Sequence, residues 1–374
     1  MNGGKLKNLS RRDFLKAGTA SAIGLAGTVA LQACAPTPAP TAAVEMASTD
    51  HNTQHSADHG SDAMFMPGFV GEVDHAANGF NPSDILTDFD YGRVSTLPNG
   101  QTLREYRFYA IIKEIEVVPG IKYEAWTYNG RVPGPTIRCS EGDHIRITFV
   151  NGTPHPHTIH FHGIHPSKMD GVYEVVPEGG NFVYEFDAEP FGVHQYHCHT
   201  MPLAQHISRG LYGAFIVDPK DGWQKADYEC VMVMSGIDID FDQENDFYNV
   251  NFIPFHYDKH PIHIKTDELV RIFLVNMLEF DPINSFHLHA NFFHYYSTGT
   301  SRTPSEYTDT IALMQAQRGI LEFRYKYPGK YMFHAHKTEF AELGWTGVFQ
   351  VEEALRWRRP MSRMKMFRRN LMRA

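Results

Sequence analysis

The sequence contains few of the features that define disulfide-rich, nucleic-acid-binding or membrane-spanning proteins. Only four of its 374 residues are cysteine, and none forms the Cys-x-x-Cys pattern of zinc and dithiol redox sites. No apolar run reaches the roughly 18 residues that a transmembrane helix needs, and helical periodicity is weak. Five basic residues among the first 33 and eight among the last 20 leave the rest of the chain strongly acidic, with a net charge of −9 overall. Such a body repels phosphate backbones, so nucleic acid is not expected as a partner.

The composition is that of a folded, turn-rich protein with unusually many histidines. Hydrophobic residues make up 42% of the chain and aromatic residues 13%, with 30 glycines and 22 prolines. Disordered and collagen-like chains have different compositions. A chain of 374 residues can form two domains with separate cores. The 22 histidines are the feature that needs a chemical explanation.

The N-terminal segment has the pattern of an export signal. Residues 10–16 resemble the twin-arginine signal and precede a mildly apolar stretch that is too weak to span a membrane. Residues 31–34 resemble a lipobox, in which Cys34 would be lipidated; the alternative is cleavage without a lipid. We therefore expect residues 1–33 to direct export. The protein would then be lipid-anchored on the outer side of the cytoplasmic membrane, or periplasmic or extracellular.

Two further terminal segments are expected to lie outside the folded body. Residues 34–66 are rich in Pro, Ala, Thr and Ser and predict a disordered tether, whose His51, His55 and His59 are either solvated or able to scavenge metal. Residues 354–374 form a basic tail interleaved with Met and aromatic residues. This tail either lies on anionic headgroups or is a solvated end.

An internal repeat divides the remaining chain into two domains. Residues 145–151 recur as 270–276, each followed shortly by a His-x-His, and residues 210–218 recur as 344–352. Between them, Glu-Phe, Gly and His recur at the same offsets. Three matched segments in one order indicate a duplicated fold. Short alternating runs separated by turn signals predict an all-β protein with two tandem β-sandwiches, at 67–220 and 221–353.

The histidines are concentrated in His-x-His pairs. Chance would give about one such pair in this composition. On a strand, residues i and i+2 project from the same face, so each pair offers two adjacent imidazoles, as a cluster of metal ions requires. Four of the pairs occupy matching positions in the two repeats. The five pairs are His155/His157, His160/His162, His197/His199, His287/His289 and His334/His336.

The same period predicts a second metal site in the first repeat alone. Cys198 must point away from its flanking histidines, on the side that His157 also faces. His206 on the next loop completes a set of two histidines and one cysteine, which favours copper in an electron-transfer site. In the second repeat Asn284 and Ala335 replace His157 and Cys198.

These motifs resemble the four copper motifs of multicopper oxidases over nearly all of residues 100–353. The arrangement is similar to two-domain, laccase-like oxidases, which are related to copper nitrite reductases and carry type 1 copper in the first of two cupredoxin-like Greek-key domains. The resemblance implies about four copper ions per chain. It assigns type 1 copper to His157, Cys198 and His206, type 2 copper to His160 and His287, and the type 3 pair to His162, His197, His199, His289, His334 and His336.

Two departures from the oxidase pattern bear on this assignment. His206 follows Cys198 by eight positions, which is a longer spacing than in the usual oxidase loop and closer to the nitrite reductase arrangement. The axial position holds Leu211, a non-bonding residue, where many relatives have methionine. Met201 is an alternative axial donor, although it precedes His206.

Three functions compete for these residues. An oxidase would take single electrons from a phenol-like compound, a metal ion or a small redox protein and reduce dioxygen to water. A nitrite reductase producing nitric oxide needs only three imidazoles at its catalytic copper, and that family has an acid at the position of His160 and an aliphatic residue at that of His289. A copper-storing lipoprotein would not need Cys198. Eight histidines favour the oxidase.

The remaining expectations concern protons, thiols and assembly. Asp170 resembles the family's acid near type 2 copper, and Glu339 follows His336 by three residues; either is a candidate proton relay.

Cys139 and Cys230 could form a disulfide or remain buried thiols. The short link between the domains and the family resemblance together predict a homotrimer, in which the first domain of one subunit meets the second domain of the next around a three-copper cluster.

Overall fold

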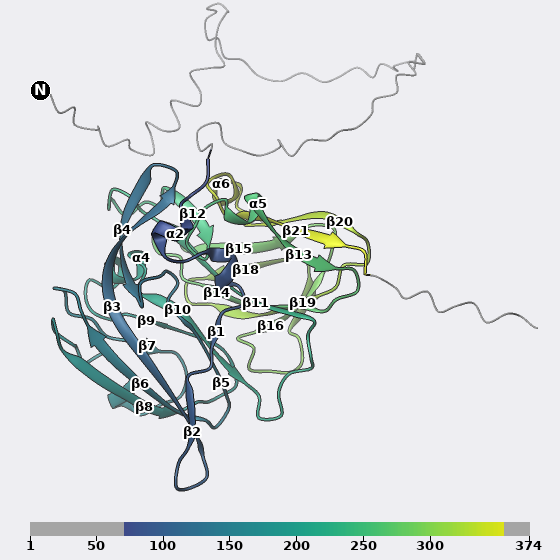
Figure 1. The fold of residues 1–374 in the computed structure, drawn as a ribbon. Coiled ribbons are helices and arrows are strands. Elements are labelled where there is room, and N and C mark those ends of the chain that lie inside the picture. Colours follow the sequence, from purple (N-terminus) through teal and green to yellow (C-terminus); the bar gives the residue numbers. More distant parts are fainter. Residues whose placement is uncertain (1–70, 355–374) are drawn as a thin grey trace, which may run out of the picture. The chain divides into compact units, whose positions relative to one another are not determined.

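The computed structural model describes residues 71–354, which form two tandem β-sandwiches with a few short helices (Figure 1). The predicted all-β fold class is therefore confirmed. The expected export signal, lipobox, tether and all but the first residue of the basic tail lie outside the described residues. Within residues 71–354, none of the helices combines the length and apolarity needed to cross a membrane.

The first sandwich is built from strands β1 to β10, blue to teal in Figure 1. One sheet has the order β1-β5-β10-β9-β7, and the other has the order β2-β3-β6-β8 with β4 paired to β3. Parallel pairing of β3 with β6 and of β5 with β10 means that the chain crosses between the sheets. The strands are β1 (Phe89–Asp90), β2 (Arg93–Thr96), β3 (Thr102–Val118), β4 (Ile121–Tyr128), β5 (Thr136–Ser140), β6 (His144–Asn151), β7 (His160–Phe161), β8 (Asn181–Asp187), β9 (Gly192–His197) and β10 (Tyr212–Asp218).

The second sandwich repeats this plan with strands β11 to β21. Its sheets have the orders β12-β11-β14-β19-β16-β17 and β13-β21-β20-β15-β18, again with parallel pairs, β11 with β14 and β13 with β21. The strands are β11 (Tyr228–Ile237), β12 (Phe247–Val250), β13 (His260–Lys265), β14 (Val270–Asn276), β15 (Ile283–Leu288), β16 (Phe293–Ser297), β17 (Glu306–Thr308), β18 (Thr310–Met314), β19 (Arg318–Phe323), β20 (Gly329–His334) and β21 (Thr346–Glu352).

Short helices connect the strands. Two of them, α2 and α3, precede β1 and are capped by the side chains of Asp74 and Asn81, which accept hydrogen bonds from backbone N–H groups of the first turn. The helices are α2 (His75–Asn78), α3 (Pro82–Ile85), the 3₁₀ turn η1 (Ser167–Met169), α4 (Leu203–Ser208), α5 (His256–Lys259) and α6 (Thr338–Glu342).

The repeated sequence segments correspond to equivalent strands that differ in burial. Strand β6 alternates between buried and half-buried residues, as the sequence pattern predicts. Strand β14 is buried along its whole length, contrary to the alternation expected for it. One of its faces, with Phe273 and Val275, packs in a core cluster that also contains Val193 and Ile216 of the first sandwich. Contact between the two sandwiches therefore removes the solvent-facing side of this strand.

The junction between the sandwiches combines apolar packing with buried charge. The link between β10 and β11 is short, and Glu229 just beyond it accepts hydrogen bonds from Arg138 at 2.9 Å and from Arg271 at 2.6 Å. Arg138 and Arg271 come from different sandwiches and are almost fully buried, so each guanidinium needs such a partner. Arg318 of β19 also donates to the carbonyl of Val193 at 3.0 Å.

Candidate metal centres

His157, Cys198 and His206 meet inside the first sandwich. His157 lies in an isolated bridge to Val176, and Cys198 directly follows β9. His206 lies on α4 and not on the loop expected from the sequence, because residues 203–208 form one short helical turn after Pro202. The Nδ1 atoms of the two histidines are 3.1 Å apart, and Cys198 Sγ lies 3.2 Å from Nδ1 of His206 and 3.7 Å from Nδ1 of His157.

The chemistry of this set suits a soft metal ion. Burial lowers the pKa of His157 to about 3 and that of His206 to about 4, so both imidazoles are neutral at ordinary pH and offer lone pairs. Burial also raises the pKa of the Cys198 thiol, so its thiolate requires a nearby cation. Two neutral nitrogens and one sulfur around a buried point fit copper.

The surroundings of this set distinguish the two candidate axial residues. Leu211 is fully buried, and its carbonyl accepts a hydrogen bond from the Cys198 N–H at 2.9 Å. Met201 is 76% exposed, so its thioether points away from the buried set. Trp126 covers the set from another side, with its ring centroid 5.3 Å from that of His157 and 4.9 Å from that of His206. No sequence motif marks this tryptophan.

A second group of histidines lies on the opposite side of the Cys198 backbone. One ring nitrogen from each of His160, His162 and His197 lies within 4.8 Å of the others, and the His199 ring centroid is 5.3 Å from that of His160. Strands β7 and β9 bring them together by pairing His160 with His197. We call His160, His162, His197 and His199 the first histidine set.

The second sandwich contains a matching group. One ring nitrogen from each of His287, His289 and His334 lies within 4.8 Å of the others, and the His336 ring centroid is 5.1 Å from that of His287. Strands β15 and β20 pair His287 with His334, as β7 and β9 pair their equivalents. We call His287, His289, His334 and His336 the second histidine set.

Hydrogen bonds to backbone carbonyls fix the tautomer of one histidine in each set. Nδ1 of His197 lies 2.9 Å from the Cys198 carbonyl, and Nδ1 of His334 lies 2.7 Å from the Ala335 carbonyl. A carbonyl only accepts hydrogen bonds, so each Nδ1 carries the proton and each Nε2 has a lone pair. Nε2 of His334 nevertheless lies only 2.9 Å from Nε2 of His289. Such an arrangement fits a bound cation.

Among residues 71–354, the two histidine sets remain separate. No ring contact and no group of ligand atoms within 4.8 Å of one another combines a histidine of the first set with one of the second. The sets differ in exposure, because His197 is buried whereas His289 is exposed.

The two candidate proton-relay residues have different neighbours. Asp170 accepts a hydrogen bond at its backbone carbonyl from Nδ1 of His160 at 2.6 Å, and its carboxylate lies 3.2 Å from the same nitrogen and 3.7 Å from Nε2 of His165. Glu339 lies on α6 with its carboxylate 3.6 Å from Nζ of Lys337. Asp170 is thus in direct contact with a metal-ligand candidate, and both proton-relay roles stay predictions.

Apolar and amide side chains fill the mononuclear position in the second sandwich. Asn284 and Ala335 are buried there, as expected from the repeat. The backbone hydrogen bonds identify Phe340 as the equivalent of His206. The Leu211 N–H donates to the His206 carbonyl, and the Trp345 N–H donates to the Phe340 carbonyl in the same way. Phe340 was not identified from the sequence, because no motif marks it.

The other two cysteines of the described chain are not bonded to each other. Cys139 and Cys230 are both buried, free thiols. Burial raises the pKa of both, which keeps them protonated and apolar in character. Of the two alternatives left open by the sequence, the structure has the buried thiols.

Family models and solved structures agree with the motifs. Two models, both described as multicopper oxidase, match residues 112–222 and 233–354. A solved structure described as a multicopper oxidase is 58% identical, with a TM-score of 0.74, and the match covers 75% of this chain and all of that chain. A copper nitrite reductase from Nitrosomonas europaea is 27% identical with a TM-score of 0.63, covering 67% of this chain and 94% of the other.

The curated relatives include copper-containing nitrite reductases and a copper-resistance protein. A copper-containing nitrite reductase of Neisseria meningitidis is 26% identical over 272 residues, which is 65% of this chain and 68% of the relative. Copper resistance protein A of Escherichia coli is 33% identical over 175 residues, which is 42% of this chain and 28% of the relative. Because the two family models together span most of both sandwiches, the chain belongs to the multicopper oxidase family.

Proposed function

We propose that this protein couples the one-electron oxidation of a reductant to the four-electron reduction of dioxygen to water. One observation carries the proposal. Two matching sets of four histidines are present, and the first is joined through the backbone of Cys198 to a separate site with two histidines and one cysteine.

The residues divide into a mononuclear site and a cluster site. His157, Cys198 and His206 would hold type 1 copper, with Leu211 as a non-bonding neighbour. His160 and His287 would hold type 2 copper, and the other six histidines of the two sets would hold the type 3 pair. Four copper ions at these positions would supply single-electron transfer at one end and dioxygen reduction at the other.

The chain itself links the two sites. Cys198 points to the mononuclear site, whereas the adjacent His197 belongs to the first histidine set, so a few covalent bonds separate them. The geometry is held by the His199 N–H, which donates to Oγ1 of Thr158 at 3.0 Å, while the Thr158 N–H donates to Cys198 Sγ at 3.4 Å. These two hydrogen bonds hold the Cys198 thiol and the backbone of His199 in fixed positions relative to Thr158.

The reductant would deliver electrons near His206. The His206 side chain is almost buried, but its neighbour Trp126 stacks on the exposed His155, with ring centroids 4.5 Å apart. Aromatic rings at this edge are suited to a phenol-like reductant by stacking. A metal ion or a small redox protein would require only a close approach to the same edge.

Asp170 is the better placed of the two proton-relay candidates. Its carboxylate contacts His160 and His165, beside the first histidine set. With a side chain 32% exposed, it can exchange protons with solvent and hold one next to the site. Glu339 remains a second candidate and lies near Lys337.

We propose a homotrimer in which the first histidine set of one subunit meets the second set of the next. The separation of the two sets within residues 71–354 supports this arrangement, because neither set alone provides eight ligands. A head-to-tail contact that closes into a ring satisfies every set in the assembly.

The cellular location is proposed from the terminal sequences alone. Export by the twin-arginine route with a lipid on Cys34 would leave the protein anchored on the outer side of the cytoplasmic membrane, or periplasmic or extracellular if it is cleaved without a lipid. The basic tail, residues 354–374, would either lie on anionic headgroups or be a solvated end. Equal liposome binding by soluble protein with and without this tail would remove its membrane role.

A copper nitrite reductase producing nitric oxide is the second candidate. Several curated relatives carry that name, including the one in Neisseria meningitidis. The eight-residue spacing from Cys198 to His206 also favours it. Histidines at positions 160 and 289 favour the oxidase, because a single catalytic copper needs only three imidazoles.

The two candidates are separated by one assay on the copper-loaded protein. A phenol or ferrous salt is supplied as reductant, and oxygen uptake is measured in air while nitric oxide is measured under argon with nitrite. The oxidase predicts one dioxygen consumed per four electrons and no nitric oxide. Robust nitric oxide formation without oxygen uptake would establish the reductase instead.

A further inference from the structure

Three histidines outside all the copper motifs form a separate cluster. His75 begins α2, His256 begins α5, and His260 follows α5 by one residue. One ring nitrogen from each lies within 4.8 Å of the others. The His256 ring centroid lies 4.9 Å from that of His75 and 4.6 Å from that of His260. The cluster thus joins the segment that precedes the first sandwich to the second sandwich.

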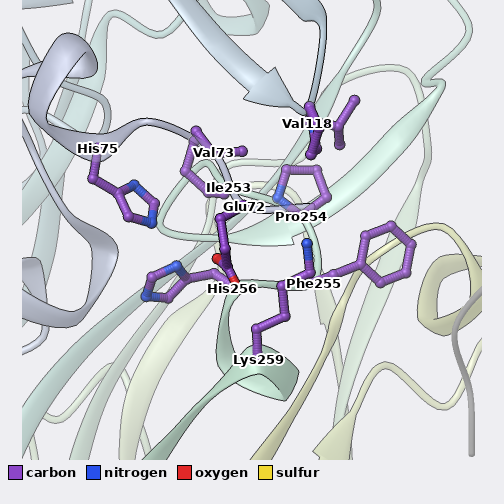
Figure 2. A pocket seen from close by; sticks show the side chains of 10 residues that line it. Glu72, Val73, His75, Val118, Ile253, Pro254, Phe255, His256 and Lys259 are labelled. Atoms are coloured by element: carbon purple, nitrogen blue, oxygen red, sulfur yellow. The ribbon is translucent and has the colours of Figure 1, made fainter. Parts of the chain in front are cut away.

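A carboxylate and a small cavity accompany these histidines. Oε2 of Glu72 lies 3.1 Å from Nε2 of His260. A cavity of about 10 Å³ is lined by Glu72, His75, His256 and Lys259 together with apolar side chains, and Figure 2 shows Glu72, His75 and His256 on one side of it. That volume holds about one water-sized particle.

The cluster also contains an unpaired nitrogen. Nδ1 of His75 is buried and has no hydrogen-bond partner, which is costly for a polar atom unless a ligand occupies its lone pair. His256 is oriented by Oγ of Ser83, 2.8 Å from its Nε2. Burial lowers the pKa of His256 to about 2, and burial followed by the proximity of His260 lowers that of His75, so both rings are neutral.

We propose that His75, His256 and His260, with Glu72 as a fourth donor, bind one divalent ion of the zinc or copper class. Imidazole and carboxylate are donor types that zinc prefers, and copper(II) binds the same donor types more tightly. The side chains of Glu72 and His260 are 62% and 42% exposed, so an ion can enter from solvent.

The ion would fix the segment 71–88 against the second sandwich. This segment already contacts it through the Tyr257 hydroxyl, which donates to the Pro82 carbonyl at 2.8 Å, and through the Val231 N–H, which donates to the Leu86 carbonyl at 2.8 Å. On the other side, Asn78 donates to the Glu116 carbonyl of β3 at 2.8 Å. The site is therefore structural: it connects both sandwiches through one segment and stabilises the folded chain by mass action.

The test compares the full-length protein with single variants in two metal arms. Wild type, His75→Ala, His260→Ala and the control His263→Ala are saturated with zinc or with copper, dialysed, and analysed for metal per chain. His263 is an exposed histidine on the same strand β13, paired with Glu352 at 3.2 Å. We expect His75→Ala and His260→Ala to retain one ion per chain fewer than wild type and control, in at least one arm.

Thermal unfolding supplies a readout that does not depend on turnover. Adding zinc or copper should raise the midpoint of wild type and control more than that of either cluster variant, because only the former have the ion to lose on unfolding. Circular dichroism before metal addition checks that the variants fold. Equal metal content in all four proteins would overturn the proposal, since the ions would then be held elsewhere, as by the histidines at 51, 55 and 59.

Discussion

The two sandwiches hold nearly the same backbone around very different chemistry. The N–H after β9, from Cys198, donates to the Leu211 carbonyl at 2.9 Å, and the N–H after β20, from Ala335, donates to the Trp345 carbonyl at 3.2 Å. One position carries a thiol beside two imidazoles, whereas the other is packed with aromatic rings. The Trp345 ring lies 5.7 Å from Phe286 and 5.9 Å from Phe333, between centroids.

On the opposite side of the same strands the two sandwiches agree. The His199 N–H donates to Thr158 Oγ1, and the His336 N–H donates to Ser285 Oγ, so each histidine set is held by the same frame. A duplicated backbone can therefore keep one function on one face and lose another on the opposite face through a few side-chain changes. We infer that the mononuclear site belongs to the first sandwich alone and that the cluster belongs to both.

The largest expected effect comes from making the first sandwich resemble the second. Cys198→Ala introduces the residue found at Ala335, so the mononuclear site should lose its thiolate, its blue colour and its reductant oxidation, down to the rate without protein. Absorption spectra measure the blue colour, and oxygen uptake measures the oxidation of the reductant. Cys230→Ala, at another buried thiol, is the matched control, and oxidation at the wild-type rate by Cys198→Ala would refute the assignment.

A change on the shared face should separate colour from turnover. His289→Ala removes a ligand candidate of the second set, so oxygen uptake should be abolished while the blue colour of the first sandwich persists. His294→Ala, on β16 of the other sheet of the same sandwich, serves as the control. Loss of colour in His289→Ala together with oxygen uptake would show that the two faces are not independent.

A smaller loss of activity is expected from a change at Asp170, where the surroundings of the two histidine sets differ. His287 has the Asp309 carbonyl at 2.9 Å and the Thr310 hydroxyl at 2.7 Å from its Nδ1, whereas His160 also has a carboxylate. Asp170→Asn keeps the backbone carbonyl but removes the proton carrier, so kcat should fall by roughly 10²-fold with copper content unchanged. Asp187→Asn is a control at an exposed carboxylate, and an unchanged kcat and pH profile in Asp170→Asn would exclude the relay.

The smallest effect concerns the potential of the mononuclear site. Leu211 provides no donor atom, so Leu211→Met should lower the reduction potential by adding thioether donation. Redox titration of the blue absorption compares the variant with wild type and with Leu203→Met on α4. A potential that is unchanged or raised would count against Leu211 as the axial neighbour.

Local periodicity explains why much of this was predictable from the sequence. Four of the five His-x-His pairs lie on or next to a strand end. The two-residue period predicts Cys198 and His157 on one side of the chain and His197 on the other, and in the structure Cys198 groups with His157 whereas His197 groups with His160. The repeat also predicted the all-β fold with two sandwiches, which the structure confirms. Trp126 and Phe340 were not predicted, because each reaches its place through contacts between segments distant in sequence, which no local pattern records.

The third histidine cluster shows the same limit. His256 and His260 are four residues apart, but nothing in the sequence indicates that His75, some 180 residues earlier, lies beside them. The sequence places residues 71–88 at the start of the first domain, and no motif there predicts which elements they contact. The structure gives this segment contacts to both sandwiches, so its position is determined by tertiary packing alone.

We propose that one cluster is completed by a first sandwich and a second sandwich from different subunits, and mixing two inactive variants tests this most directly. Inactive His160→Ala and inactive His334→Ala chains are mixed in equal amounts, dissociated and reassembled, and oxygen uptake is measured. Random assembly into rings would give two intact histidine sets at about a quarter of the interfaces, so a corresponding part of the activity should return. No recovery, together with a monomeric mass for the active wild-type enzyme, would show that each cluster is completed within a single chain.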